Sequence, residues 1–142
     1  MHISLLPVLF VSGAAALGIN CRGSGVCFFN DASLQAVHNQ VGNMIAAGGG
    51  NRYYWDGGKR AVVPRGALQI ACSQGSQGSV CAFYQNGASG YAWDAYAQIQ
   101  GLLDHGCRQC GSIPTLPGND VNTGELTVNY VRNPCCLGDC YC

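Results

Sequence analysis

The sequence predicts an α+β fold in which two helices cover one face of a mainly antiparallel sheet, with many disulfides. Three observations support this prediction. Strand-like and helix-like segments follow one another in the order strand, helix, strands, helix, strands. Both helical segments are amphipathic, so each has one apolar face to bury against a sheet. The 142 residues include ten cysteines, an even number that is typical of small secreted domains stabilised by disulfides.

Residues 1–16 are predicted to be a secretory signal peptide. An apolar run from Ile3 to Val11 is followed by small residues, with Ala14 and Ala16 in the A-x-A arrangement of a cleavage site. The run is too short to cross a bilayer, which takes about 20 residues. We therefore expect one mature domain, residues 17–142, that is secreted to the extracellular space and does not insert into a membrane. An uncleaved anchor is the alternative.

The first part of the mature chain is predicted to hold an edge strand and a helix. The strand covers residues 17–21, and Asp31 is a suitable N-cap for the helix that follows. The helix is indicated by apolar residues at helical spacing, namely Leu34, Val37 and Val41, and it ends near Ala47 because three glycines follow. His38 lies beside this apolar stripe and is interpreted as a packing or surface histidine.

The middle of the chain contains an aromatic segment and two strands. Residues 51–58 form either a hairpin or an exposed loop, in which Tyr53, Tyr54 and Trp55 are a binding surface or a cover for the core. Residues 67–72 and 80–85 are predicted to be strands joined by a flexible hairpin loop.

A second helix and a last strand complete the predicted elements. Ser89 is the expected N-cap, the apolar stripe contains Trp93, Ala97, Ile99 and Leu102, and Gly106 is the expected residue after the helix. The last strand covers Glu125–Val131, where Leu126, Val128 and Tyr130 alternate with the other residues.

Charge and motifs exclude several functional classes. Seven basic and seven acidic residues give no net charge and no basic stripe, which argues against a nucleic-acid partner. The sequence has no phosphate loop, nucleophile elbow or metalloprotease motif, so we expect no cofactor and no enzyme activity. A small hydrolase whose carboxylates or histidine meet only in the fold is the remaining enzymatic alternative. Four basic residues do cluster within fourteen positions, opposed only by Asp56: Arg52, Lys59, Arg60 and Arg65.

Cys107 and Cys110 form a C-x-x-C motif that is compatible with three chemistries. A redox dithiol usually lies at a helix N-terminus, whereas this motif follows a helix. A zinc site needs four ligands, which Cys21 and Cys27 would complete. The secretory route favours the third possibility, in which each cysteine forms a structural disulfide with a distant partner.

Several ordered blocks of the chain resemble the KP4 family of fungal killer toxins. They are LGINCRGS at residues 17–24, HGCRQCGS at 105–112, GND at 118–120 and GELTVNYV at 124–131. The resemblance implies an α/β sandwich, an antiparallel sheet with two antiparallel helices packed on one face. It also implies a secreted toxin that inhibits susceptible cells by blocking calcium uptake through channels.

The resemblance further implies that all cysteines form disulfides. Cys21 would pair with Cys107 and Cys27 with Cys110. Cys72 would pair with Cys135 or Cys136, Cys81 would take another tail cysteine, and the two left among Cys135, Cys136, Cys140 and Cys142 would close on each other. The family's additional central cysteines are missing here, near Gly48, Asp56 and Tyr96, so the central bridges are expected to be rearranged.

The leading hypothesis is a monomeric toxin that binds a membrane protein of the target cell, a calcium channel by resemblance. The expected target-binding residues are Lys59, Arg60, Arg65 and Trp55. The lysine implicated in the activity of the family falls on Val62 in this chain, which favours an alternative. That alternative is a secreted effector or binding module that engages a host protein or a cell-wall glycan without blocking a channel.

Overall fold

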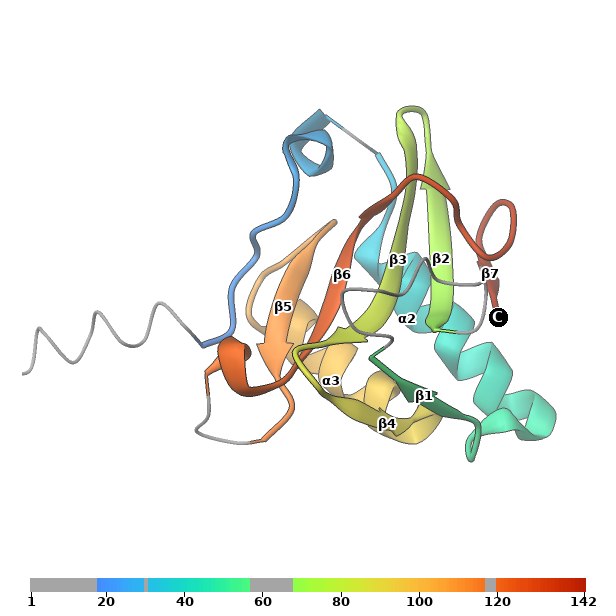
Figure 1. The fold of residues 1–142 in the computed structure, drawn as a ribbon. Coiled ribbons are helices and arrows are strands. Elements are labelled where there is room, and N and C mark those ends of the chain that lie inside the picture. The colour runs from blue at the N-terminus through green and yellow to red at the C-terminus, as the bar shows by residue number, and fades with distance from the viewer. Residues whose placement is uncertain (1–17, 30, 57–67, 117–119) are drawn as a thin grey trace, which may run out of the picture.

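The computed structural model describes residues 18–29, 31–56, 68–116 and 120–142 (Figure 1). The predicted signal peptide, residues 1–16, lies outside the described residues. So do Lys59, Arg60, Val62 and Arg65.

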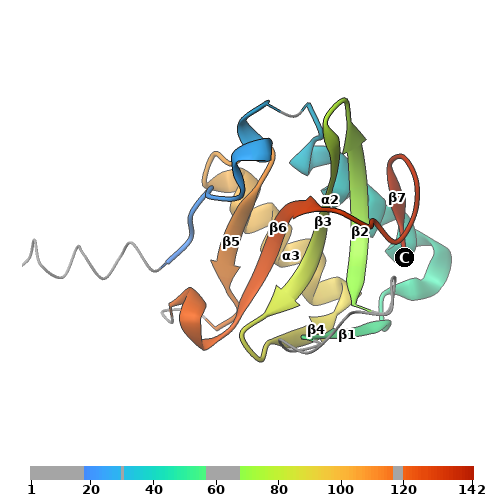
Figure 2. The same cartoon turned by 45° about the horizontal axis from the view of Figure 1, so that its top comes forward.

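Within the described residues, five antiparallel strands form the main sheet in the order β5-β6-β3-β2-β7 (Figure 2). The strands are β2 (Gln69–Gly75), β3 (Gly78–Gln85), β5 (Gly111–Pro114), β6 (Glu125–Val131) and β7 (Cys140–Tyr141). The predicted strands at 67–72, 80–85 and 125–131 are present. The hairpin between β2 and β3 is tighter than expected, because backbone pairing continues to Gly75 and Gly78. Gly78 has a positive φ of 124°, which a residue with a side chain rarely adopts.

Two α-helices of the described chain, α2 (Leu34–Met44) and α3 (Ala92–Asp104), pack on the same face of this sheet (Figures 1 and 2). Their apolar stripes are fully buried; they contain Leu34, Val37, Val41, Ile99 and Leu102. The strands contribute Ile70, Val80, Leu126 and Val128 to the same core. The predicted α+β architecture is therefore correct, with the core between helices and sheet.

Both helices begin later than the sequence predicts. Ser33 is the N-cap of α2, and its side chain accepts a hydrogen bond from the Ala36 backbone N–H at 3.1 Å. Asp31 is not the cap, because its carboxylate accepts a hydrogen bond from the Ser76 backbone N–H at 2.6 Å. This bond ties the start of α2 to the β2–β3 turn. The α2 helix continues as a π-helical turn, η2 (Ile45–Gly49), in which Gly48 has a φ of 93°.

A small second sheet replaces the predicted hairpin or loop at residues 51–58. β1 (Tyr53–Trp55) pairs antiparallel with β4 (Ser89–Tyr91), a segment far away in the sequence. Ser89 therefore belongs to a strand and is not the N-cap of α3. The cap is Tyr91, whose backbone N–H donates to the Asp94 carboxylate at 2.8 Å.

The described N-terminal segment runs beside β5 but does not form the predicted edge strand. A single bridge joins Asn20 to Ser112, and a 3-10 helix, η1 (Gly25–Phe29), follows. A second 3-10 turn, η3 (Val121–Thr123), precedes β6. No helix of the described residues has the length and apolar character needed to span a membrane.

All ten cysteines lie within the described residues and form disulfides. Cys21–Cys107 and Cys27–Cys110 are the pairs that the resemblance implies. The partners expected for Cys72 and Cys81 are wrong, whereas the expectation that tail cysteines close on each other is correct. Cys72 bonds to Cys81 rather than to a tail cysteine, because the two residues face each other across β2 and β3 with their Cα atoms 4.1 Å apart. The four tail cysteines then pair among themselves, as Cys135–Cys142 and Cys136–Cys140.

Candidate functional site

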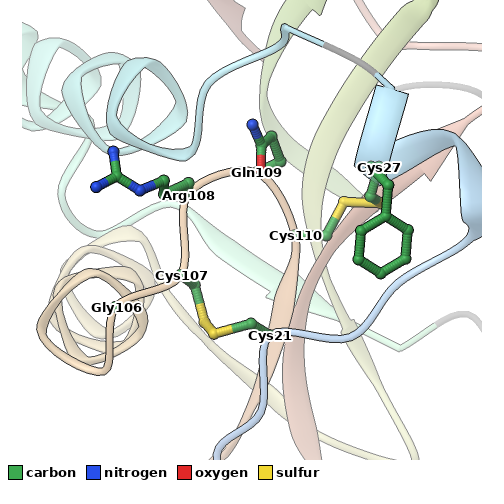
Figure 3. A pocket seen from close by; sticks show the side chains of 8 residues that line it. Cys21, Cys27, Gly106, Cys107, Arg108, Gln109 and Cys110 are labelled. Atoms are coloured by element: carbon green, nitrogen blue, oxygen red, sulfur yellow. A yellow bond between two sulfur atoms is a disulfide. The ribbon is translucent and has the colours of Figure 1, made fainter.

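The C-x-x-C segment forms one wall of a small hollow of about 220 Å³ (Figure 3). The α3 helix ends at Asp104, the φ of 98° at Gly106 turns the chain toward Cys107, and Cys110 leads into β5. The two disulfides of this motif connect it to the N-terminal segment. The hollow is lined by Cys21, Cys27, Phe28, Gly106, Cys107, Arg108, Gln109 and Cys110.

The two disulfides beside this hollow have a structural role, and we call them the C-x-x-C clamp: Cys21–Cys107 and Cys27–Cys110. Its four sulfur atoms are all disulfide-bonded, so neither the redox nor the zinc interpretation of the C-x-x-C applies. Arg108 and Gln109 point away from the disulfides (Figure 3). The Arg108 carbonyl oxygen accepts a hydrogen bond from the Leu34 N–H at 2.8 Å, which holds the first turn of α2. The clamp therefore joins the N-terminal segment, both helices and β5.

The acidic residues, which were candidates for hydrolytic chemistry, have structural partners. Each of the seven carboxylates accepts a hydrogen bond from a nearby backbone or side-chain amide; the residues are Asp31, Asp56, Asp94, Asp104, Asp120, Glu125 and Asp139. These bonds stabilise turns and helix termini. The Ser76 N–H bond, for example, lowers the pKa of Asp31 by favouring its charged form.

The described histidines also have structural positions. His38 is buried and stacks on Tyr96 of α3, with ring centroids 4.0 Å apart. Burial lowers the pKa of His38 below its ordinary value, because the charged imidazolium would lose its hydration. His38 is thus a packing residue, one of the two roles expected for it. His105 is exposed and lies at the C-cap of α3.

The aromatic segment is divided between surface and core. Tyr53 and Trp55 of β1 are exposed, while Tyr54 between them is buried and its hydroxyl donates to the Met44 sulfur at 3.3 Å. Trp55 therefore lies on the surface, as a target-binding residue requires, and its role stays a prediction. Its predicted partners Lys59, Arg60 and Arg65 belong to residues 57–67, which the chain enters from β1 and leaves toward β2.

Two further exposed aromatic residues, Tyr91 and Trp93, were missed by the sequence analysis. Trp93 was assigned to the buried stripe of α3, but that stripe is Ala92, Ala95, Ile99 and Leu102. The buried side chains follow one another at intervals of three or four residues, and Trp93, directly after Ala92, does not fit these intervals. This offset is the signal in the sequence that distinguishes it from the core.

Comparison with known proteins identifies the family of this chain. The family model Kp4 matches residues 5–132. The KP4 killer toxin of Ustilago maydis P4 virus is 38% identical over 134 residues, which cover 92% of this chain and 88% of the toxin. The chain therefore belongs to the Kp4 family, which includes a killer toxin among its members.

Proposed function

We propose that this protein is a secreted, monomeric killer toxin that binds a membrane protein of the target cell from outside and blocks a calcium channel. The observation that carries the proposal is the 38% identity to a killer toxin over most of both chains. Calcium-channel block is the activity that the resemblance implies. Residues 1–16 direct secretion in this proposal, and residues 17–142 are the toxin.

The disulfides support an extracellular role. Ten cysteines in five bridges are typical of proteins that fold in an oxidising compartment and act outside the cell. A rigid scaffold also loses little conformational entropy when it binds, which favours affinity.

Lys59 and Arg60, assisted by Arg65, are the proposed blocking residues. The mouths of cation channels carry rings of carboxylates, to which a presented cation is attracted. Trp55 is 46% exposed and lies four residues before Lys59, so it is available for an apolar contact beside them. Val62 occupies the position of the family's implicated lysine, so in this chain the cation must come from a neighbouring residue.

The test is calcium uptake by susceptible fungal cells exposed to the purified, oxidised mature protein. Uptake should fall, and it should recover when external calcium is raised. The double variant Lys59→Ala, Arg60→Ala should lose the effect without a lower melting temperature. Arg132→Ala, which removes an exposed arginine after β6, is the matched control and should stay active. Reduced and alkylated protein should be inactive.

Unchanged uptake with intact disulfides would reject channel block. It would favour the alternative of a secreted binding module that acts without a channel. The exposed aromatic residues of β1 and β4 are the observation that supports this alternative.

A further inference from the structure

Three aromatic side chains form an exposed surface on the small sheet, which we call the aromatic ledge: Tyr53, Trp55 and Tyr91. Their exposed fractions are 48%, 46% and 48%. Both strands have the burial pattern exposed, buried, exposed, so these outward side chains share one face. Tyr53 faces Tyr91 directly across the two strands.

The rings of the ledge are ordered with respect to one another. Tyr53 and Trp55 are nearly parallel, with an interplanar angle of 22° and centroids 6.1 Å apart. Tyr91 meets Tyr53 edge-on, with centroids 5.2 Å apart. Tyr53 and Trp55 are two residues apart on one face of β1, so their nearly parallel rings offer two successive aromatic faces to a ligand. This arrangement suits a ligand that is an extended chain of ring-shaped units.

The inner side of the ledge is fixed to the core. Tyr54 is buried beneath β1, and Gly90 of β4 packs so closely on Tyr84 that an added methyl group would overlap the tyrosine hydroxyl. The Tyr84 hydroxyl donates to the Gln98 side chain at 2.8 Å, and burial raises the pKa of Tyr84. The ledge is therefore rigid before any ligand arrives, which lowers the entropy cost of binding.

Trp93 at the start of α3 is a further exposed aromatic residue, two positions after Tyr91 of the ledge. It is 56% exposed, and its backbone N–H donates to the Gly50 carbonyl at 3.2 Å. Its ring lies against the Gly50 backbone, where a Cβ atom would overlap it. The next hydrogen bond, from the Ala92 N–H to the Arg52 carbonyl at 2.9 Å, ties the same turn to the residue before β1.

The chemistry of the ledge points to a sugar. Tyrosine and tryptophan combine an apolar ring face with a polar edge, and a pyranose ring has the matching combination of a C–H face and hydroxyl groups. The face of an aromatic ring is the negative part of its quadrupole, so it attracts the weakly positive C–H groups. A binding surface for lipid tails would instead be expected to contain aliphatic residues. Tyrosine and tryptophan are also common at protein interfaces, so a protein partner is disfavoured by the small size of the ledge and not by its composition.

The charged residues beside the ledge and its small size limit the classes of ligand that it can bind. The carboxylates of Asp56 and Asp94 lie at the ends of β1 and β4, where they hold the Gly87 and Tyr91 N–H groups. Arg52, directly before β1, carries the opposite charge, so the described residues flanking the ledge form no cluster of positive charge for phosphates, uronic acids or anionic membranes. The two strands have three residues each, whereas a standard protein interface takes about 20–30 residues a side.

We propose that the aromatic ledge binds an uncharged β-linked polysaccharide, in which linkages such as β-1,4 keep successive sugar rings in an extended chain. Stacking on Tyr53 and Trp55 supplies the affinity, and the hydroxyl groups of Tyr53, Tyr91 and Ser89 are available at the edges. This proposal does not depend on channel block, because it uses described residues outside 57–67 and an independent binding assay.

Tryptophan fluorescence is the first test, because the two tryptophans of the chain are Trp55 and Trp93. Chitohexaose and laminarihexaose, both uncharged and β-linked, are titrated into the oxidised mature protein. At least one should give a saturable change in emission. Maltohexaose, which is α-linked, polygalacturonate, which is anionic, and phosphatidylcholine vesicles should give none.

Variants then locate the site by calorimetry. Trp55→Ala should weaken binding by about two- to twelvefold, because an aromatic contact contributes about 0.5–1.5 kcal/mol and 1.4 kcal/mol is a factor of ten. Trp55→Phe keeps a ring and should retain most of the affinity. Phe28→Ala, which removes an aromatic residue that is 75% exposed on η1, is the control and should bind normally.

Three results would overturn the proposal: no binding of either β-linked oligosaccharide, equal binding by Trp55→Ala, or binding only of vesicles or polygalacturonate. Circular dichroism of each variant establishes that it is folded. If Trp55→Ala is unfolded, Tyr53→Ala and Trp55→Phe carry the comparison.

Discussion

The two disulfides of the C-x-x-C clamp are predicted to stabilise the protein in a strongly non-additive way. Cys21–Cys107 and Cys27–Cys110 close loops with sequence separations of 86 and 83 residues. In the chain-entropy description, closing one loop of this length stabilises the fold by about 4.6 kcal/mol. Each bridge alone therefore provides most of the restriction on the unfolded chain, and the second adds less.

The size of the second contribution follows from the interleaved order of the cysteines. When Cys21–Cys107 is intact, Cys27 and Cys110 are connected through six residues on one side and three on the other. Closing a loop of about nine residues with the second bridge stabilises the fold by about 2.6 kcal/mol. Removing one bridge should thus cost about 2.6 kcal/mol, and removing both about 7.2 kcal/mol, which is about 2 kcal/mol more than the two single losses together.

The measurement is equilibrium unfolding in urea for four proteins: the parent, Cys21→Ala with Cys107→Ala, Cys27→Ala with Cys110→Ala, and the variant with all four changes. The other three disulfides stay in place throughout. Additive losses, in which the double removal costs only the sum of the two single removals, would refute the reasoning, because they would mean that each bridge acts independently through local contacts in the folded state. A cost near 4.6 kcal/mol for either bridge alone would refute it as well.

Two further predictions concern buried side chains. Because burial lowers the pKa of His38 and its Nε2 atom has no hydrogen-bond partner among the described residues, the unfolded chain binds a proton below pH about 6.5 that the folded chain does not. The free energy of unfolding should fall as the pH drops from about 6.5 to the folded pKa, by at most about 1.4 kcal/mol per pH unit. Above pH about 6.5, His38 should make no pH-dependent contribution to it. Urea unfolding between pH 5 and 7.5 checks this, and His38→Phe, which can still stack on Tyr96, should reduce the slope; parallel curves would contradict it. Gly50→Ala should cost about 1–3 kcal/mol in thermal unfolding and shift the tryptophan emission, because the methyl group displaces Trp93. The Gly50 backbone is helical, with φ −60° and ψ −25°, so an unchanged melting temperature would show that the ring moves aside freely.

Features that depend on local sequence were predictable. The spacing of Leu34, Val37 and Val41 indicates the buried face of α2 without knowledge of any other segment, because the helical period alone decides which residues share a face. The strand at β6 and the glycine that follows α3 are local in the same sense, but burial in β6 does not alternate as predicted: its first four residues are all buried and its last three are half-buried. The family resemblance, whose blocks include Cys21, Cys107 and Cys110, also implied the Cys21–Cys107 and Cys27–Cys110 pairs.

Features that depend on distant segments were decided by the tertiary structure. Asp31 and Ser33 are both good N-caps, and the choice between them follows from the Ser76 N–H, which Asp31 binds. The Cys72–Cys81 bridge follows from the register of β2 against β3.

The sequence by itself determined the fold class, the two amphipathic helices and the clamp at the C-x-x-C motif. The tertiary structure decided the aromatic ledge, because Tyr53 and Tyr91 meet only when β1 pairs with β4. Periodicity identifies the face on which a side chain lies, but it carries no information about which distant strand supplies its neighbour. That pairing depends on how the helices and the main sheet pack, and so it appears only in the folded chain.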